Sequence, residues 1–342
     1  MRHLSNERTS NMDRRKLGKS ELTVSPIALG AWAIGGWMWG GSDRKEAIRA
    51  IQACPDHGIT AVDTAPAYGF GHSERILGEA IRGRRNRYEI FTKAGLRWDD
   101  DRGAYYFTSE DNDGKMKDLY KFSGKDSIIH ECEESLKRLG TDYIDLYQIH
   151  WPDPTTPVEE TMEAFRILLE QGKIRAAGVS NYSVEEMERA CRVVTLASNQ
   201  VPYSMVRRDM EQEVIPWCVS HGCGILAYSP LQRGLLTGKI TPDHPFRPGD
   251  SRPDTPHFRI NNLIQINQFL EEVKPLASSK KITLSQLVIR WTLQQHGITV
   301  ALVGARDRRQ VKENAGALSV SLTEDELAFI DRELGKLELE LD

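Results

Sequence analysis

Residues 61–69 read Ala61-Val62-Asp63-Thr64-Ala65-Pro66-Ala67-Tyr68-Gly69. Together with the apolar residues that precede them, from Ile59 onward, they are typical of a buried β-strand that ends at a turn. The strand ends by presenting the carboxylate of Asp63. Five residues later, beyond a turn that contains proline, the chain presents the phenol of Tyr68.

Two further apolar runs end in an ionisable residue. Residues 88–92 are followed by Lys93, and residues 143–149 are followed by His150. A single strand end of this kind is ordinary, but three of them supply an acid, an amine and an imidazole. We therefore expect a shared site if these strand ends converge.

Strand-like and helix-like segments alternate along the chain. Strands are predicted at residues 27–30, 59–62, 88–92, 143–149, 174–179, 195–201, 223–228 and 298–303. Helices are predicted after a cap at Ser42 or Asp43 and at residues 72–82, 126–138, 158–171, 183–192, 210–221, 262–279, 283–295, 307–316 and 323–334. Alternating β and α segments imply a parallel sheet. Eight such repeats predict an α/β fold in the form of a single (β/α)₈ TIM barrel.

Some segments add to the regular repeat. Residues 15–25 predict an N-terminal hairpin, and the segment 323–334 predicts an extra C-terminal helix. The long connections 94–125 and 229–261 both follow strands, so they lie on the C-terminal face of the barrel. Long loops on that face are expected to wall the site and to set its substrate preference.

Bulk composition bounds the class of protein. The chain has 342 residues, 39% hydrophobic and 27% charged, with a net charge of -4, so nothing indicates a nucleic-acid partner. No apolar run approaches the ~18 residues of a membrane span. We predict a flexible extension over residues 1–11 and one barrel domain over residues 12–342. Five cysteines without a CxxC motif favour a reducing compartment, and cytoplasm is the expected location.

The four ionisable residues allow proton transfer to an oxygen. A lysine ammonium ~4 Å from a phenolate attracts it by about 4 kcal/mol at an effective dielectric near 20, and lowering a phenol pKa by ~2 units requires about 2.7 kcal/mol. We therefore expect Lys93 to lower the pKa of Tyr68. Asp63 would hold Lys93 in place and keep it charged, and His150 would orient a carbonyl oxygen by hydrogen bonding.

Each residue also has a structural alternative. Asp63 and Lys93 can form an ion pair with only a structural role. Tyr68 can be an aromatic residue that packs in a loop, and His150 can be a hydrogen-bonded histidine at a strand end. The shared placement at strand ends favours the joint site over these separate roles. No nucleophile and no metal-ligand spacing accompany the four residues, so we expect no metal.

These residues carry a resemblance to a known family. The segments 62–69, 92–93 and 149–152 look like the catalytic motifs of the aldo-keto reductase superfamily. The segments 178–181, 199–203 and 227–231 resemble its cofactor motifs. The match runs from about residue 14 to about residue 336, with every motif in order. The loop 30–36 and the ending 303–306 look most like the bacterial branch that holds inositol-operon and general-stress NADPH-dependent reductases.

The resemblance implies a function and a set of site residues. It implies NADPH-dependent reduction of an aldehyde or ketone, or the reverse oxidation, with NADH possible but less favoured. Tyr68 would be the general acid, with Lys93 and Asp63 as its tuning partners and His150 as the carbonyl orienter. The implied cofactor-binding residues are Gly30, Ala31, Trp32, Asp63, Ser180, Asn181, Gln200, Tyr228, Ser229, Pro230, Leu231, Gly234, Leu236, Gly304, Arg306, Gln310, Glu313 and Asn314.

Within that set, the resemblance assigns separate parts of the cofactor. Ser180, Asn181 and Gln200 would bond the nicotinamide carboxamide, and Tyr228 would stack on its ring. The segment 229–236 would follow the pyrophosphate.

The adenine end departs from the familiar pattern. Many members carry Lys-Ser and a later Arg where this chain has Gly304-Ala305 and Gln310. Arg306 stands beside them, and a guanidinium can bind a 2′-phosphate bidentately. NADP is therefore expected over NAD.

Alternatives remain at this stage. A nicotinamide-binding regulatory subunit with vestigial turnover would keep the same residues. A phosphate-sugar isomerase would share the barrel, but it would leave the pairing of Tyr68 with Lys93 unexplained. The expected partner is a small carbonyl or alcohol substrate, with no nucleic acid and no membrane. The expected assembly is a monomer or a weak homo-oligomer.

Overall fold

The computed structural model describes residues 13–39, 41–246 and 248–341. Eight parallel strands close into a barrel, in the order β10-β11-β12-β13-β3-β4-β5-β9. Their bounds are β3 Ile27–Gly30, β4 Ala61–Asp63, β5 Glu89–Ala94, β9 Ile144–Ile149, β10 Ile174–Ser180, β11 Leu196–Pro202, β12 Gly224–Tyr228 and β13 Ile298–Gly304. The predicted (β/α)₈ barrel is confirmed. The predicted extension over residues 1–11 lies outside the described residues.

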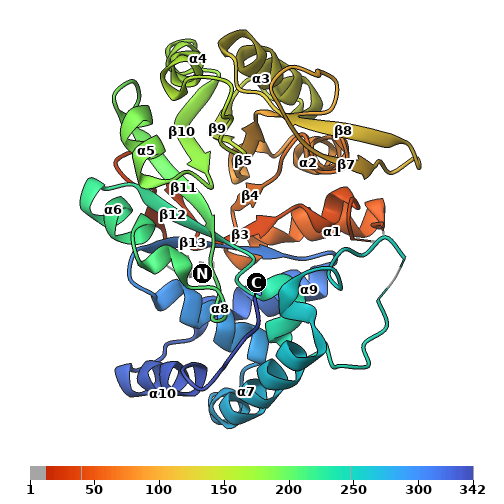
Figure 1. The fold of residues 1–342 in the computed structure, drawn as a ribbon, viewed down its shortest axis with the longest axis vertical. Helices are drawn as coiled ribbons and strands as arrows, with labels where there is room; N and C mark the ends of the chain where they lie inside the picture. Colours follow the sequence, from red (N-terminus) through yellow and green to blue (C-terminus); the bar gives the residue numbers. More distant parts are fainter. Residues whose placement is uncertain (1–12, 40, 247, 342) are drawn as a thin grey trace, which may run out of the picture.

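The α-helices surround this barrel, and α7 and α10 lie together on one side of it (Figure 1). Their bounds are α1 Arg44–Ala53, α2 His72–Ile81, α3 Lys125–Leu139, α4 Val158–Glu170, α5 Val184–Cys191, α6 Val214–His221, α7 Ile260–Ser279, α8 Leu284–Gln294, α9 Arg308–Ala315 and α10 Glu324–Leu334. Short 3₁₀ helices lie at η1 Ala33–Gly35, η2 Cys54–His57, η3 Arg85–Arg87, η4 Asp209–Glu211, η5 Gln232–Thr237, η6 Pro256–Phe258 and η7 Gly316–Ser319. None of the helices in the described part of the chain has the length and apolar character that a membrane span requires.

Local signals fix most helix ends. The side chain of Asp43 accepts hydrogen bonds from two backbone N–H groups of the first turn of α1, which satisfies donors that the helix itself leaves unpaired. The helix predicted at 210–221 differs, because α6 begins only at Val214. Glu213 has φ -134° and ψ -52°, which is not helical geometry, so η4 and α6 are separate.

The barrel interior is filled in layers. The predicted N-terminal hairpin forms β1 Arg15–Lys16 and β2 Thr23–Val24, and it supplies Leu17 and Val24 to an apolar cluster that also contains Ala61, Phe91 and Leu146. Side chains two residues apart on a strand face the same side. The residues two positions further along β4, β5 and β9 therefore face the same interior, one layer nearer the C-terminal ends. Those residues are Asp63, Lys93 and Gln148.

The connection 94–125 was expected as a long loop, but most of it is folded. It forms a three-stranded antiparallel sheet in the order β6-β8-β7, with β6 Leu96–Arg97, β7 Ala104–Glu110 and β8 Met116–Lys121. We call it the rim sheet. Its strands have no clear local hydrophobic alternation, and their burial pattern is mixed. Contacts with other loops of the barrel rim stabilise it, which is why the sequence did not predict it.

Candidate active site

Lys93 is the centre of the polar cluster at the C-terminal ends of the strands. Its fully buried ammonium donates to Asp63 Oδ2 at 2.6 Å, to the backbone oxygen of Thr64 at 2.9 Å and to Tyr68 Oη at 3.2 Å. An ammonium has three N–H donors, so each is used. Because Tyr68 Oη accepts from Lys93, its own hydroxyl proton is free to point elsewhere.

The charge state of this cluster follows from burial and pairing. Burial opposes the charge on Lys93, but Asp63 and Tyr68 outweigh it and raise the pKa of Lys93. For Tyr68, burial raises the pKa, and the opposing effect of Lys93 is smaller. The expectation that Lys93 lowers the Tyr68 pKa below its ordinary value is therefore wrong. Desolvation of the phenolate outweighs the attraction of one ammonium.

His150 completes the group from the end of β9. Burial and the nearby charge of Lys93 hold the pKa of His150 well below its usual range, so the imidazole is neutral at pH 7. Its ring centroid lies 5.6 Å from that of Tyr68. A neutral imidazole has one N–H donor. The structure thus brings Asp63, Tyr68, Lys93 and His150 together.

A cavity of about 880 Å³ opens from this cluster. The predicted residues that line it are Gly30, Trp32, Asp63, Tyr68, His150, Ser180, Asn181, Gln200, Tyr228, Ser229, Pro230, Leu231, Gly234, Gly304, Arg306, Gln310, Glu313 and Asn314. Ala31, Lys93 and Leu236 are buried behind this surface. The Ala31 N–H donates to the backbone oxygen of Asp63, and the Leu236 N–H donates to the backbone oxygen of Leu231. These two amides are therefore not available to a ligand.

Side chains at one end of the cavity are already linked to each other. Tyr228 Oη donates to Asn181 Oδ1 at 3.0 Å, and Asn181 Nδ2 donates to Ser180 Oγ and to the backbone oxygen of His150. Asn181 has φ 62°, which asparagine tolerates better than most residues. This end is therefore a preorganised polar surface beside Tyr68 and His150.

A second part of the cavity wall, which begins at Trp32 beside Tyr68, presents N–H donors. Trp32 Nε1, Trp39 Nε1 and Arg233 Nε are buried without a hydrogen-bond partner in the described part of the chain. All three residues line the cavity, and the Arg233 guanidinium lies 5.2 Å and 5.3 Å from the two indole ring centroids. Buried donors normally have partners, so this part of the wall fits an anionic ligand group. Such donors suit the phosphates of a dinucleotide.

Further cationic groups lie around Trp39. The guanidinium groups of Arg252 and Arg306 lie 5.3 Å and 5.4 Å from its ring centroid. Arg252 is ion-paired with Asp250 at 2.6 Å, whereas burial lowers the pKa of Arg233 to about 10. The backbone N–H of Arg306 donates to Gln310 Oε1 at 2.7 Å. Gln310 therefore positions the Arg306 backbone.

The remaining wall of the cavity is aromatic and comes partly from the rim sheet. Trp37 stacks on Phe107 with centroids 6.0 Å apart, and its Nε1 donates to Ser109 Oγ at 2.8 Å. The ring centroid of Tyr106 lies 5.6 Å from that of Trp151. Trp32 and Trp151, which directly follow strand ends, both line the cavity. Tyr106 and Phe107 of β7 line it as well.

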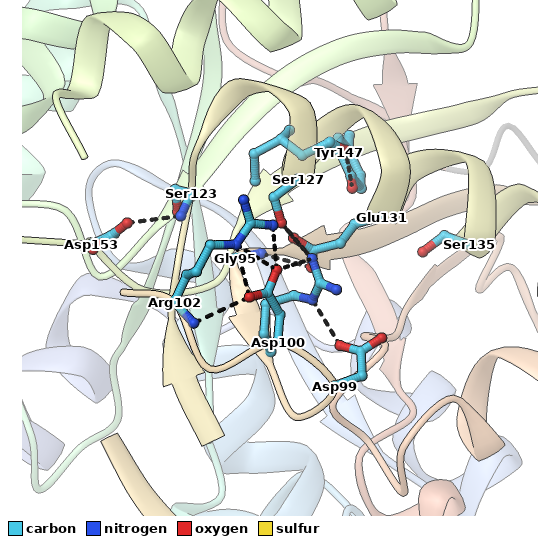
Figure 2. Close-up of polar contacts among 12 residues, drawn as sticks. Gly95, Asp99, Asp100, Arg102, Ser123, Ser127, Glu131, Ser135, Tyr147 and Asp153 are labelled. Carbon is cyan, nitrogen blue, oxygen red and sulfur yellow. Dashed lines mark hydrogen bonds and ion pairs between the residues drawn. The ribbon is translucent and has the colours of Figure 1, made fainter. Parts of the chain in front are cut away.

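A buried carboxyl group ties the rim sheet to the barrel (Figure 2). Glu131 of α3 accepts from the Gly95 backbone N–H at 3.0 Å and from Ser127 Oγ at 3.2 Å. Arg97 of β6 lies 3.9 Å from Glu131 and donates to Asp99 at 2.8 Å. Burial raises the pKa of Glu131 to about 7, although Arg97, Gly95 and Ser127 act in the opposite direction.

Sequence reasoning missed several of the cavity residues. Arg233 lies within the segment 229–236, and Trp39 follows the loop 30–36. A single residue in a loop gave no reason to select either of them. Sequence reasoning also missed Gln148, which is fully buried beside Lys93. It was treated only as part of an apolar strand. A polar residue at an interior position of that strand was the available signal, since buried polar groups require partners.

Comparisons with known proteins identify the family of this chain. Residues 26–334 match the Aldo/keto reductase family. The chain is 41% identical over 304 residues to aldo-keto reductase YhdN of Bacillus subtilis, covering 88% of this chain and 87% of that protein. It is 36% identical over 326 residues to the NADH-specific methylglyoxal reductase of Escherichia coli, covering 94% and 97%.

Solved structures show the same architecture. Glycerol dehydrogenase AKR11B4 from Gluconobacter oxydans superposes with a TM-score of 0.85 and 38% identity, covering 95% of this chain and 96% of that one. An aldo/keto reductase from Klebsiella pneumoniae in complex with NADP and acetate superposes with a TM-score of 0.71 and 30% identity, covering 96% and 99%. This chain therefore belongs to the aldo/keto reductase family and is an NAD(P)H-dependent oxidoreductase that acts on carbonyl compounds.

Proposed function

We propose that this enzyme reduces an aldehyde or ketone with NADPH, and that Tyr68 is the proton donor. The observation that carries the proposal is the contact of one buried ammonium, Lys93, with both Asp63 and Tyr68, which line the cavity. His150, which lines the same cavity, would donate a hydrogen bond to the substrate oxygen. We also propose that residues 12–342 act as one catalytic domain.

The proton step uses only groups of this chain. The phenol proton faces away from Lys93 and can pass to the substrate oxygen as negative charge develops there. The phenolate that remains is 3.2 Å from Lys93 Nζ, an attraction of about 5 kcal/mol at an effective dielectric near 20. When bound, the reduced nicotinamide supplies the hydride. Because the pKa of Tyr68 is raised, the phenol stays protonated throughout the neutral range, which suits reduction.

The preference for NADPH rests on Arg306, which lines the cavity together with Gln310, Glu313 and Asn314. A guanidinium can hold a 2′-phosphate. Klebsiella proteins similar to this chain form complexes with NADP and NADPH, whereas the Escherichia coli relative is named NADH-specific. Ser180, Asn181 and Gln200 are proposed at the carboxamide and Tyr228 at the ring.

Cofactor choice is tested by titrating the protein with NADPH and NADH and following tryptophan fluorescence, since Trp32 and Trp39 line the cavity. We expect tighter binding of NADPH. An Arg306→Met variant should lose that preference and retain NADH binding. Equal affinities in the unmodified protein would contradict the proposed preference.

The catalytic role is tested with Tyr68→Phe against a panel of reactive aldehydes. We expect unchanged NADPH binding and a fall in kcat of at least about 10²-fold, the usual contribution of a general acid. Tyr106→Phe is the matched control, because Tyr106 lines the same cavity. Normal turnover in Tyr68→Phe would remove Tyr68 as the acid. One slow turnover by the unmodified protein would instead indicate a regulatory subunit.

We propose that the enzyme works in the cytoplasm as a monomer or a weak homo-oligomer. All five cysteines are free, which suits a reducing compartment. Sedimentation over a range of concentrations tests the assembly.

A further inference from the structure

A glutamine lies in the barrel interior at the level of the catalytic residues. Gln148 is fully buried on β9, two residues before His150. In the strand register it lies beside Lys93 on one side and Gly178 on the other. The layer beneath it is apolar and contains Leu146. A buried amide costs free energy unless it is hydrogen-bonded, so its partners indicate its role.

Those partners are Asp63 and Gln200. Gln148 Nε2 donates to Asp63 Oδ1 at 3.3 Å, and Gln200 Nε2 donates to the same oxygen at 2.9 Å. Gln200 Nε2 also donates to Gln148 Oε1 at 3.2 Å. A carboxylate only accepts, so both amides turn their NH₂ groups toward Asp63. The carbonyl oxygen of Gln200 then faces away from Asp63, and Gln200 lines the cavity.

The neighbouring strand leaves room for this side chain. A Cβ atom at Gly178 would lie 3.1 Å from Gln148 Cγ and 2.8 Å from Ser198 Oγ. Both distances are shorter than ordinary contacts, so a larger residue at position 178 would displace Gln148. Gly178 therefore belongs to the same arrangement.

We propose that Gln148 is a positioning residue for the reduction. It fixes the direction of the Gln200 amide, and it holds the oxygen of Asp63 that Lys93 does not contact. The inference rests on the proposed function, because it requires Asp63 to act on the Lys93–Tyr68 pair and Gln200 to face the nicotinamide.

The first expected effect is on proton transfer. The ionisable groups that face Tyr68 are Asp63 on β4, Lys93 on β5, His150 after β9 and Tyr228 on β12. The negative charge of Asp63 raises the pKa of Tyr68, and hydrogen bonds to Asp63 weaken that influence. Loss of the Gln148 bond should therefore make the Tyr68 phenolate harder to form.

The test of this effect is Gln148→Met, which keeps a similar volume and removes both bonds. In alcohol oxidation, where the phenolate is the base, we expect the acidic limb of the kcat profile to move to higher pH by about half a unit. Leu146→Met is the matched control, since it alters the same strand and the same interior side but not this network. It should leave the pH profile unchanged.

The second expected effect is on the nicotinamide end. With its direction no longer fixed, Gln200 should bind the carboxamide less well. We expect Gln148→Met to weaken NADPH binding by about 3–10-fold and to leave the affinity for 2′-phospho-ADP-ribose, which lacks nicotinamide, unchanged. A simple packing defect would not separate these two ligands.

Gln148→Asn gives a second variant, which keeps the amide on a shorter side chain. It should shift both measurements in the same direction, and it decides the question if Gln148→Met does not fold. If the folded variants match Leu146→Met in pH profile and in both affinities, the proposal is wrong. An unmodified protein that binds no NADPH would overturn the proposed function instead, so the two failures are distinguishable.

Discussion

Two buried ion pairs of this enzyme differ in how closely their partners approach. In the polar cluster at the strand ends, Lys93 and Asp63 are 2.6 Å apart, and the pKa of Lys93 is raised. Beneath the rim sheet, Arg97 and Glu131 are 3.9 Å apart, and burial raises the pKa of Glu131 to about 7. Both pairs are secluded from water, but only the first is in direct contact.

The difference shows what keeps a buried pair charged. Coulomb attraction has to exceed the free energy of desolvation, which requires short contacts and additional hydrogen bonds. Asp63 has Lys93, Gln148 and Gln200 as donors. Arg97 interacts with Asp99 and Asp100 as well as with Glu131. The desolvation of the Glu131 carboxylate is therefore less well compensated. The short contact with Asp63 helps to keep Lys93 charged, whereas Glu131 of the rim pair titrates near neutral pH.

The largest effect is expected for Lys93→Met. Asp63 would remain buried without its cation, which costs about 3–5 kcal/mol of unfolding free energy, and kcat should fall by at least about 10²-fold. Urea unfolding and steady-state kinetics check these values. The double variant Lys93→Met/Asp63→Asn should regain stability but no activity. A single variant as stable as the double one would show that Lys93 does not compensate for the burial of the Asp63 carboxyl group.

A smaller, pH-dependent effect is expected for Arg97→Met. At pH 6 Glu131 can hold a proton, so the loss of Arg97 should cost only about 1 kcal/mol. At pH 8 the same change should cost about 2 kcal/mol, because Glu131 must then either stay charged without its partner or hold a proton about one pH unit above its pKa. Urea unfolding at both pH values checks this. Arg102→Met, at an exposed neighbour, is the control, and equal losses at pH 6 and pH 8 would contradict the comparison.

Glu131→Gln isolates the titration itself. The folded-state pKa of about 7 exceeds the ordinary value near 4.3, so the native state binds the proton more tightly than the unfolded chain. Stability from this proton is present below pH ~4 and is lost as the pH rises through ~7. Relative to the unmodified protein, the glutamine variant should gain about 2 kcal/mol between pH 5 and pH 8. Thermal or urea unfolding measures this gain.

The control for that prediction is Glu134→Gln on the exposed side of the same helix. Its stability difference from the unmodified protein should stay within about 0.5 kcal/mol at every pH. A flat difference for Glu131→Gln would show that Glu131 does not change its protonation state across this range.

The smallest effect is expected where the rim sheet makes a neutral contact. Ser109→Ala removes the acceptor of Trp37 Nε1, which should cost about 1 kcal/mol and raise KM a few-fold without changing kcat. Kinetics with a bulky aldehyde check this. A change in kcat alone would show that the rim sheet acts on chemistry and not on substrate binding.

Much of this molecule could be predicted locally. Apolar runs predicted the eight strands, and Asp43, one of the two candidate caps, does begin α1. The strand-end positions of Asp63, Lys93 and His150 indicated one site. The rim sheet could not be predicted, because contacts such as Trp37 with Phe107 join segments about 70 residues apart. The direction of the Tyr68 pKa depended on burial, which sequence spacing does not report.

The sequence by itself determined the barrel and the residue types at its rim, since both follow from the period of apolar residues and from what stands at each strand end. Only the tertiary structure decided how close those groups lie and how strongly they interact. The ionisation of Lys93, Glu131 and Tyr68 depends on distances, donors and solvent exclusion that arise when distant strands close. The same closure placed Gln148 between Asp63 and Gln200, because the interior of a barrel brings together side chains from strands that are not neighbours.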